Sequence, residues 1–457
     1  MPSHPASPAA RPPLQLPGGI FYGWVIVAVS FLGNWVTSTL NPVVFSIFIV
    51  SIRDDLQISL GTLAWCITAR QVSAGIAAPV LGSLVDRYGP RWLGVGCALW
   101  AGTCLVAVSY ASNVWWLYAL FFISGFSGFG VFGGGQILTG VPPANWFVAK
   151  RGRAVSYATM GGGLGTASWV VISTYLLTIM SWRQAWFLYG LLIMALLVPT
   201  YAILMRRRPE DVGLYPDGAS APAADAARAT TAPAHIEETH FTLKQAMGTS
   251  ALWLMTLAFT FHTFATNSIL FLRVPYWTDL GVSAGWIGVA VATDPFVVMI
   301  FTLVFGYLSE RMPLSRITSV GGIFRALSMG ALLITAPHAA WVFLHNVTWG
   351  VGSAGMGTGQ NLAIPAYFGR LAQGAIRGFT APIMIGAGAM SPPLIGYLLD
   401  HGIVTNHMVF AGAAVMMATA GTIFLLITRP QTQHGPRTQH GPRGHAPTEP
   451  VKRSSGA

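Results

Sequence analysis

Long apolar runs constrain the fold of this chain more than any other feature of its sequence. Twelve runs of about 20 to 30 residues are each long enough to cross a bilayer as a helix. Lipid offers the backbone no hydrogen-bond partners, so such runs are expected to form α-helices. Only 9% of the 457 residues are charged, against about a quarter in soluble domains, which excludes a water-soluble globule. The runs are 21–50, 59–84, 92–110, 115–141, 154–179, 184–205, 247–272, 283–305, 317–336, 340–364, 379–399 and 407–428.

The runs fall into two sets of six, separated by a polar segment. We therefore expect an all-α polytopic membrane protein with 12 transmembrane helices in two pseudo-symmetric six-helix bundles. Both ends of the chain and the Ala- and Pro-rich middle of the polar segment lack the apolar surface that folding requires, so disordered tails are expected. The expected parts are an N-terminal tail (1–20), an N-terminal bundle (21–205), a linker (206–246), a C-terminal bundle (247–428) and a C-terminal tail (429–457).

Basic residues are distributed unevenly over the loops. Of the 25 Lys and Arg, 20 lie in the tails, the linker and one alternating set of loops, whereas only Arg53, Arg183 and Arg273 lie in the opposite set. By the positive-inside rule, both termini and the linker are expected in the cytoplasm. The net charge is +11, but the basic residues do not form a face interleaved with exposed aromatic residues, so no nucleic-acid partner is expected.

An internal repeat relates the two halves. A shift of 224 residues superimposes the sequences of the second to fourth spans on those of the eighth to tenth without a gap. Agreement at so many positions under one shift predicts two halves of the same topology, related by an axis along the membrane normal. The matched segments are 55–61 with 279–285, 82–87 with 306–311, and 128–138 with 352–362.

The loops carry motifs that resemble those of a known family. The segment Gly82-Ser-Leu-Val-Asp86-Arg87-Tyr-Gly89-Pro-Arg91, together with the arrangement of six plus six spans, resembles the major facilitator superfamily. Within it, segments 146–165, 208–218 and 367–378 resemble bacterial relatives of the monocarboxylate porters and oxalate/formate exchangers. The resemblance implies a transporter that works by alternating access of two rocking bundles. The similarity to bacterial relatives implies a bacterial inner membrane as its location.

The loop after the second span contains the first group of candidate residues. Its glycines permit a tight turn and close backbone approach, and Asp86 can accept hydrogen bonds from helix N-terminal amides. Such contacts would hold one end of the protein closed and would have to break when it opens. The alternative is that these are solvated turn charges. The gating candidates in this loop are Gly82, Asp86, Arg87, Gly89 and Arg91. Those in its repeat copy after the eighth span are Gly306, Glu310 and Arg311.

Two charged residues occupy repeat-equivalent positions inside spans. Arg70 lies 12 residues before Gly82, and Asp294 lies 12 residues before Gly306, which places each roughly 18 Å along its helix from the loop. An uncompensated charge near the midplane costs at least ~2.5–3.5 kcal/mol, so each should face a cavity or a partner. We expect Arg70 to bind an anionic substrate group and Asp294 to carry a proton or to balance Arg70. The alternatives are a structural ion pair between them, or separate hydrogen bonds to other helices.

Several further polar residues lie inside the apolar spans. Those expected to bind substrate are Asn34, Gln136, His262, Gln360 and Asn361. Hydrogen bonds between helices are the alternative role for each of them.

For three other basic residues the sequence predicts a position but no functional role. Arg273 is expected at the outer end of its helix, and Arg325 is expected to extend its charge toward the cytoplasm or to pack. Span 379–399 contains no basic residue, so Arg377 is expected in the preceding loop.

These features favour a secondary active transporter that moves a small organic anion, a carboxylate, together with protons. The expected partners are the anionic substrate, protons and membrane lipid, with the protein monomeric and without a cofactor. An exporter of drug-like amphipathic solutes and a non-transporting ligand sensor remain as alternatives. An enzyme is not expected, because the sequence has no Ser/His/Asp set and no metal-ligand cluster within the spans.

Overall fold

The computed structural model describes residues 21–58, 60–129, 137–218, 241–334, 338–428 and 430. Every regular element among these residues is a helix, as the apolar runs predict. Eight segments, including Gly23–Leu56 and Ser250–Asp279, are long and apolar enough to cross a membrane. The tails expected at 1–20 and 429–457 lie outside the described residues, apart from Pro430.

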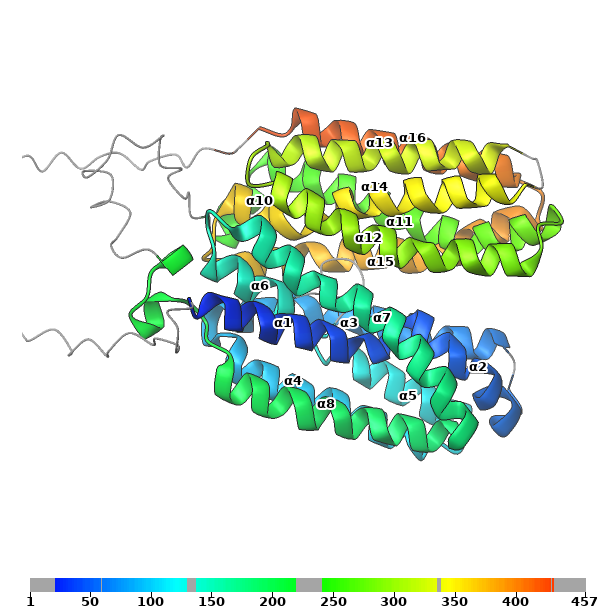
Figure 1. Cartoon of the computed structure of the whole chain (residues 1–457), viewed down its shortest axis with the longest axis horizontal. Coiled ribbons are helices and arrows are strands. Elements are labelled where there is room, and N and C mark those ends of the chain that lie inside the picture. The colour runs from blue at the N-terminus through cyan, green and yellow to red at the C-terminus, as the bar shows by residue number, and fades with distance from the viewer. Residues whose placement is uncertain are drawn as a thin grey trace, which may run out of the picture.

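The N-terminal half contains six membrane segments, two of which are interrupted (Figure 1). The first consists of α1, a short 3-10 turn η1 and α2, and the fourth consists of α5 and α6. The elements are α1 (Gly23–Thr37), η1 (Ser38–Leu40), α2 (Pro42–Leu56), α3 (Leu60–Tyr88), α4 (Pro90–Ser109), α5 (Val114–Gly125), α6 (Ile137–Trp146), α7 (Arg151–Ile179) and α8 (Trp182–Leu204).

The C-terminal half repeats this plan with uninterrupted helices, and the two bundles lie side by side in Figure 1. Its helices are α11 (Ser250–Asp279), α12 (Ala284–Leu308), α13 (Leu314–Leu333), α14 (Ala339–Phe368), α15 (Gln373–Asp400) and α16 (Asn406–Leu426). Between the bundles, the linker contains η2 (Glu210–Val212), η3 (Pro216–Gly218) and α10 (Leu243–Met247). Six segments in each half confirm the predicted fold.

The interruption of the first membrane segment has a local cause. Asn41 has an extended backbone (ψ 137°), and its side chain accepts a hydrogen bond from the N–H of Val43, so it caps a new helix. Pro42 occupies the first position of that helix, where its missing N–H costs nothing. The chain therefore ends α1 and begins α2 within a few residues.

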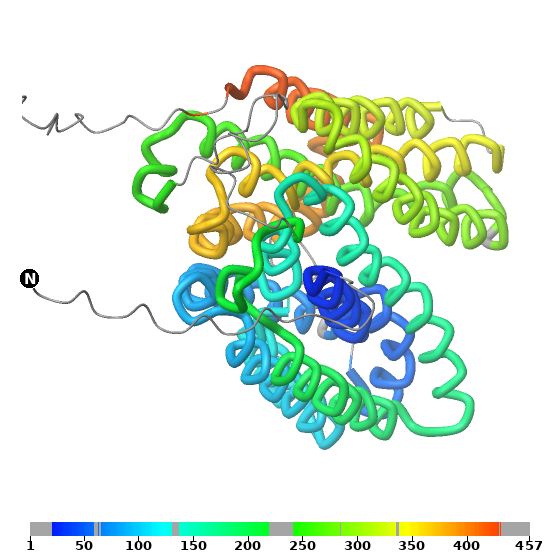
Figure 2. The backbone as a smooth tube through the Cα atoms, turned by 60° about the vertical axis from the view of Figure 1, so that its left-hand side comes forward, coloured from blue at the N-terminus to red at the C-terminus, as the bar shows by residue number. Residues whose placement is uncertain are grey.

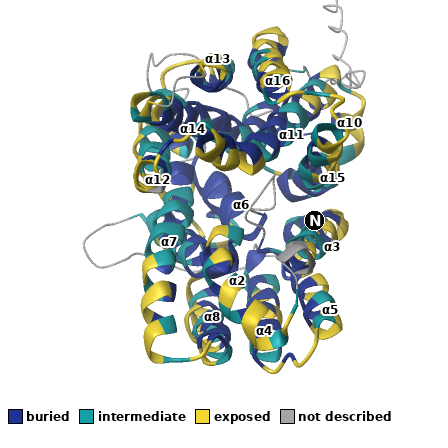
Figure 3. Ribbon diagram, turned by 90° about the vertical axis from the view of Figure 1, so that its right-hand side faces the viewer, coloured by how far each residue is buried: buried dark blue, intermediate teal, exposed yellow. Residues whose placement is uncertain are grey.

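Small residues allow the helices of each bundle to approach closely. A Cβ atom added at Gly102 of α4 would lie 2.7 Å from the carbonyl oxygen of Gly190 of α8. Figure 3 shows buried residues between the helices and exposed residues on the outer faces. The exposed residues include large apolar side chains such as Trp65, Val171 and Leu426, each at least 60% exposed. Apolar outer faces around a closely packed interior are typical of helices surrounded by lipid.

Candidate functional site

Asp86 joins the end of α3 to the start of α15. Its carboxylate accepts hydrogen bonds from the backbone N–H groups of Gly374 (3.0 Å) and Ala375 (2.7 Å) in the first turn of α15. These amides have no partner inside the helix, and the helix dipole favours a negative charge beside them. Because α3 and α15 belong to different bundles, this contact, the Asp86 latch, holds the bundles together.

Glu310 makes the repeat-related contact, which we call the Glu310 latch. It lies 224 residues after Asp86, directly after α12, and its carboxylate accepts a hydrogen bond from the N–H of Arg153 (3.0 Å) in the first turn of α7. An ion pair between Glu310 Oε2 and Arg153 Nε (2.9 Å) reinforces it. Both latches lie at one end of the molecule, where α3, α8 and α12 finish and α7, α11 and α15 begin (Figure 1). We call this the linker end.

Gly82 and Gly306 bring the latched helices into direct backbone contact. A Cβ atom at Gly82 would lie 2.0 Å from the carbonyl oxygen of Gly374. A Cβ atom at Gly306 would lie 2.0 Å from Ser156 Oγ and 2.9 Å from the carbonyl oxygen of Gly152. Any side chain at either position would therefore separate the two bundles at the linker end.

The remaining gating candidates contact neighbours in their own half of the molecule or in the linker, as far as the described contacts show. Gly89 adopts φ +82°, a conformation that favours glycine at the turn into α4. Arg91 Nε donates to the carbonyl of Ala202 (2.7 Å), the carbonyl of Arg87 accepts from Arg207, and Arg311 lies over the Tyr307 ring. The gating role of all eight residues stays a prediction.

Two further hydrogen bonds cross the linker end. Gln373 Nε2, at the start of α15, donates to Asn145 Oδ1 of α6 (3.0 Å), and both side chains are buried. Arg151 Nη1, at the start of α7, donates to the carbonyl of Pro365 in α14 (3.2 Å). The linker end of the structure is therefore closed.

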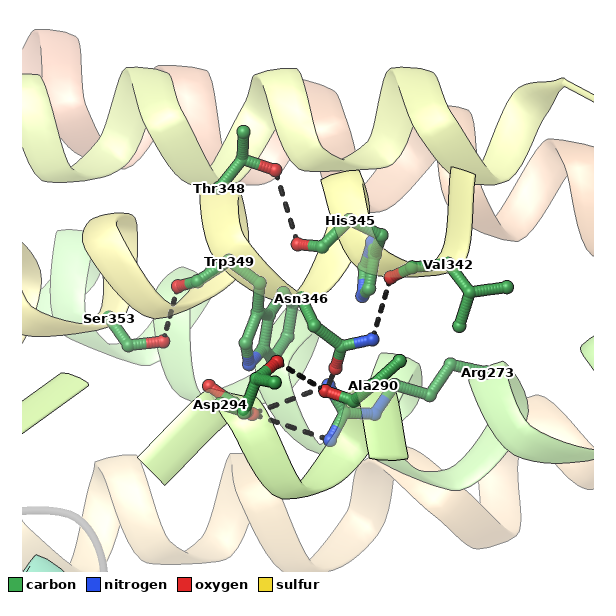
Figure 4. Close-up of polar contacts among 10 residues, drawn as sticks. Arg273, Ala290, Asp294, Val342, His345, Asn346, Thr348, Trp349 and Ser353 are labelled. Atoms are coloured by element: carbon green, nitrogen blue, oxygen red, sulfur yellow. Dashed lines mark hydrogen bonds and ion pairs between the residues drawn. The ribbon is translucent and has the colours of Figure 1, made fainter. Parts of the chain in front are cut away.

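A buried ion pair lies inside the C-terminal bundle. Figure 4 shows Arg273 extending from α11 toward Asp294 of α12 and Asn346 of α14. Both terminal nitrogens of Arg273 lie 3.4 Å from Asp294 Oδ2, and Nη1 also donates to Asn346 Oδ1 (3.2 Å). Only 6% of the Arg273 side chain and 14% of the Asp294 side chain are exposed. The second carboxylate oxygen, Oδ1, is buried and has no hydrogen-bond partner among the described residues.

A second guanidinium lies beside this pair. Arg325 of α13 is 3% exposed, and its guanidinium carbon lies 3.7 Å from the ring centroid of Trp349 in α14. The Arg273 guanidinium lies over the same ring at 5.6 Å. Within the part of the chain that the structure describes, Arg325 Nε and Nη1 have no hydrogen-bond partner. We call Arg273, Asp294, Arg325, Asn346 and Trp349 the C-bundle cluster; it holds two positive charges and one negative charge.

Arg70 lies inside the N-terminal bundle. Its Nη1 donates to the carbonyl of Leu40 (2.8 Å) and its Nη2 to the carbonyl of Phe129 (3.1 Å), where the first and fourth segments are interrupted. Interrupted helices expose carbonyl groups that need such donors. Arg70 also lines a small cavity within this bundle, with Thr39, Ser124 and Trp186 among the other lining residues. Arg70 and Asp294 thus lie in separate bundles, each with its own partners, so their described contacts do not include one another.

The other predicted substrate-binding residues lie at several levels of the bundles. Asn34 connects three helices: its Nδ2 donates to the carbonyl of Ala158 (2.8 Å), and its Oδ1 accepts from Thr139 (2.9 Å). His262 is buried, and its Nδ1 has no hydrogen-bond partner in the described ranges. Gln360 lines a small cavity beside Arg377, and the carbonyl of Asn361 accepts from Arg377. Gln136 lies outside the described residues. Their role in binding stays a prediction.

Two basic residues lie elsewhere than the sequence predicts, and a third takes one of its two predicted positions. Arg273 is inside the bundle because α11 continues to Asp279. Arg325 packs on Trp349 in the interior, which is the second of its two predicted positions. Arg377 belongs to α15, which begins at Gln373, so the eleventh segment does contain a basic residue. Pro365, which lacks an N–H, leaves the carbonyl of Asn361 free to accept from Arg377. A solitary acid inside a span was the available signal that a cationic partner lay nearby.

Two repeated six-helix bundles latched at one end define a membrane transporter fold. The sequence model of the Major Facilitator Superfamily matches residues 23–390. Since this range is well over half of the chain, the protein belongs to that superfamily and is a transporter, not an enzyme. The predicted family is confirmed.

Relatives with assigned activities match at low identity. The oxalate:formate antiporter of Oxalobacter formigenes is 26% identical over 277 residues, 60% of this chain and 55% of the antiporter. Human monocarboxylate transporter 6 is 27% identical over 173 residues, 37% of this chain and 33% of that protein. The matches thus span about half or less of these relatives.

A solved structure shares the fold. The proton:xylose symporter XylE, bound to 6-bromo-6-deoxy-D-glucose, has a TM-score of 0.63 at 15% identity, with 89% of this chain and 95% of that chain covered.

Proposed function

We propose that the protein transports a small carboxylate by alternating access and that proton transfer at Asp294 drives the cycle. The observation that carries this proposal is the charge inside the two bundles. Arg70 is held by backbone carbonyls, and the C-bundle cluster combines two guanidinium groups with one carboxylate. Each bundle thus has one net positive charge in this part of its described interior, which favours an anionic substrate.

Asp294 has the properties that a proton carrier needs. Its hydrogen bonds to Arg273 are 3.4 Å long, whereas tight charge-assisted bonds measure about 2.7–2.9 Å. Its Oδ1 accepts no hydrogen bond from any residue that the structure describes, which leaves this oxygen available for a proton. When an anion enters the bundle, protonation of Asp294 keeps the total charge constant, which couples one proton to each carboxylate.

The antiporter and the monocarboxylate transporter among the relatives support a carboxylate as the substrate class. The charge pattern of the loops supports both termini in the cytoplasm. The bacterial relatives support a bacterial inner membrane as the location. We extend the proposal to a monomer, because each bundle encloses its own charged groups.

Uptake into proteoliposomes tests the proposal. Purified protein is reconstituted, and accumulation of labelled formate and oxalate is measured with and without an inward proton gradient. We expect accumulation with the gradient, and expect Asp294→Asn to abolish it while exchange of internal for external carboxylate continues. Asp279→Asn, the same change at an exposed position on the neighbouring helix α11, is the matched control and should retain accumulation.

Arg70 is tested in the same assay. We expect Arg70→Gln to raise the half-saturation concentration at least tenfold and Arg70→Lys to raise it less, because the charge remains. Unchanged uptake by Arg70→Gln, at equal protein levels, removes Arg70 from the substrate site. Binding without flux would indicate a sensor, and transport of lipophilic cations but not carboxylates would indicate a drug exporter.

A further inference from the structure

The first part of the linker lies against the closed linker end. Residues 206–218, which we call the strap, follow α8 and lie beside the end of the N-terminal bundle (Figure 2). The strap begins with the carbonyl of Arg206 accepting from the Trp146 indole N–H (3.3 Å) and with the Arg207 guanidinium donating to the carbonyls of Asp86 and Arg87. It therefore contacts the end of α3, the helix that carries the Asp86 latch.

Asp217 binds the loop in front of α7. Its carboxylate accepts hydrogen bonds from three consecutive backbone N–H groups, those of Val148 (2.9 Å), Ala149 (2.8 Å) and Lys150 (3.0 Å). Asp217 itself adopts φ +60°, a conformation that side-chain-bearing residues rarely adopt and that Asp and Asn tolerate best. The strap is thus fixed to the residues that lead into the helix capped by Glu310.

Glu210 contacts the equivalent loop of the other bundle. Its carboxylate forms an ion pair with Arg370 Nη1 (3.2 Å), in the loop between α14 and α15. The same Nη1 donates to the carbonyl of Asn145 in α6 (3.0 Å), so Arg370 reaches across the interface between the bundles. This loop leads into α15, the helix capped by Asp86.

From these contacts we infer that the strap sets the gating equilibrium, with Asp217 as a positioning residue that holds the start of α7 where Glu310 can cap it. Glu210 has the corresponding role at α15. The two loops that the strap contacts occupy the same place in the repeat, directly before the two latched helices. The chain has one strap, and it contacts the loops next to both latches. It therefore stabilises the state in which the linker end is closed. This inference does not depend on the identity of the substrate.

The gating equilibrium is measured by double electron–electron resonance (DEER) spectroscopy on the full-length, spin-labelled protein without substrate. Spin labels replace Tyr88 and Met312, which are exposed and lie at the linker ends of different bundles. The buried Cys66, Cys97 and Cys104 are first replaced by Ala. The ratio of the long-distance to the short-distance population reports how often the linker end opens.

We expect Asp217→Asn to raise this ratio about fivefold, since it removes the charge from three amide contacts and places an NH2 group where an acceptor was. Asp211→Asn is the matched control, because Asp211 is an exposed acid of the same strap. It should leave the ratio unchanged. Asp217→Gly, which accommodates φ +60° but has no acceptor, gives the same test if the Asn variant is not recovered.

A positioning role predicts non-additivity. If Asp217 acts through the Glu310 latch, Asp217→Asn should change the ratio less than twofold once Glu310→Gln has already broken that latch. An equal effect in both backgrounds overturns the positioning role. A ratio no different from that of Asp211→Asn, with or without a lower unfolding temperature, overturns the whole inference, because a purely structural contact would change stability alone.

Discussion

Replacing Gly82 by Ala should open the linker end, because the added methyl group has no space in the closed state. Its Cβ atom would lie 2.0 Å from the carbonyl oxygen of Gly374 and 3.2 Å from the Cα atom of Gly378, whereas ordinary contacts begin at 3.4 Å. Both neighbours are backbone atoms that cannot rotate away. The helices α3 and α15 would have to separate by about 1.4 Å, which would also lengthen the hydrogen bonds of the Asp86 latch.

The magnitude follows from the cost of overpacking. Forcing one extra carbon into a closely packed contact costs about 1–3 kcal/mol. When the linker end opens, α3 and α15 separate there, so the cost falls on the closed state alone. The ratio of open to closed protein should therefore rise by a factor of about 5 to 150.

Hydrogen–deuterium exchange at the start of α15 measures this change. The amides of Gly374 and Ala375 are protected by Asp86 in the closed state, so their exchange rate should rise in proportion to the open population. Gly162→Ala in α7 is the matched control, because a Cβ atom there would have no described residue within 4 Å apart from its chain neighbours and the nearby backbone of its own helix. The reasoning is refuted if Gly82→Ala leaves the exchange of these two amides at the wild-type rate.

Two further predictions concern stability. Arg273→Gln should lower the free energy of unfolding by about 3–5 kcal/mol, because it leaves the Asp294 charge buried without its partner. The double variant Arg273→Gln/Asp294→Asn should recover most of this loss. A double variant that is no more stable than Arg273→Gln in thermal unfolding contradicts the prediction. Asn34→Ala should cost about 1 kcal/mol, since each of its two hydrogen bonds between helices contributes about 0.6 kcal/mol. An unchanged unfolding temperature for Asn34→Ala would show that these bonds contribute nothing.

The apolar runs predicted the number and order of the membrane segments because bilayer thickness fixes the length of an apolar helix. They did not predict where the helices end, because a helix continues beyond the lipid as long as its backbone is hydrogen-bonded. α11 extends seven residues past the predicted limit at 272, and α15 begins six residues before 379. Arg273 and Arg377 lie in these extensions, which is why both appeared to be loop residues.

The sequence indicated which charges need partners but not which partners they have. Arg70 and Asp294 are equivalent under the repeat, and the sequence predicted that Asp294 carries a proton or balances the charge of Arg70. A repeat that maps one bundle onto the other, however, places equivalent residues in different bundles. Each then finds partners in its own bundle: backbone carbonyls for Arg70 and Arg273 for Asp294. Only the folded C-terminal bundle, in which the Arg273 side chain extends from α11 to Asp294 of α12 and Asn346 of α14, brings these last groups together.

The latches show how a duplicated fold can acquire an asymmetric control. The carboxylates of Asp86 and Glu310 cap equivalent helices, but they do so differently. Asp86 accepts hydrogen bonds from two backbone N–H groups, whereas Glu310 accepts one and also forms an ion pair with the side chain of Arg153. Arg153 in that pair is 38% exposed, so water and salt weaken the Glu310 latch more than the Asp86 latch. Asp217 fixes the start of α7, the helix with the weaker latch, through three amides. A chain with two copies of a bundle has only one linker between them. Here that linker stabilises the start of α7, where the contact that duplication provides, the Glu310 latch, is the weaker of the two.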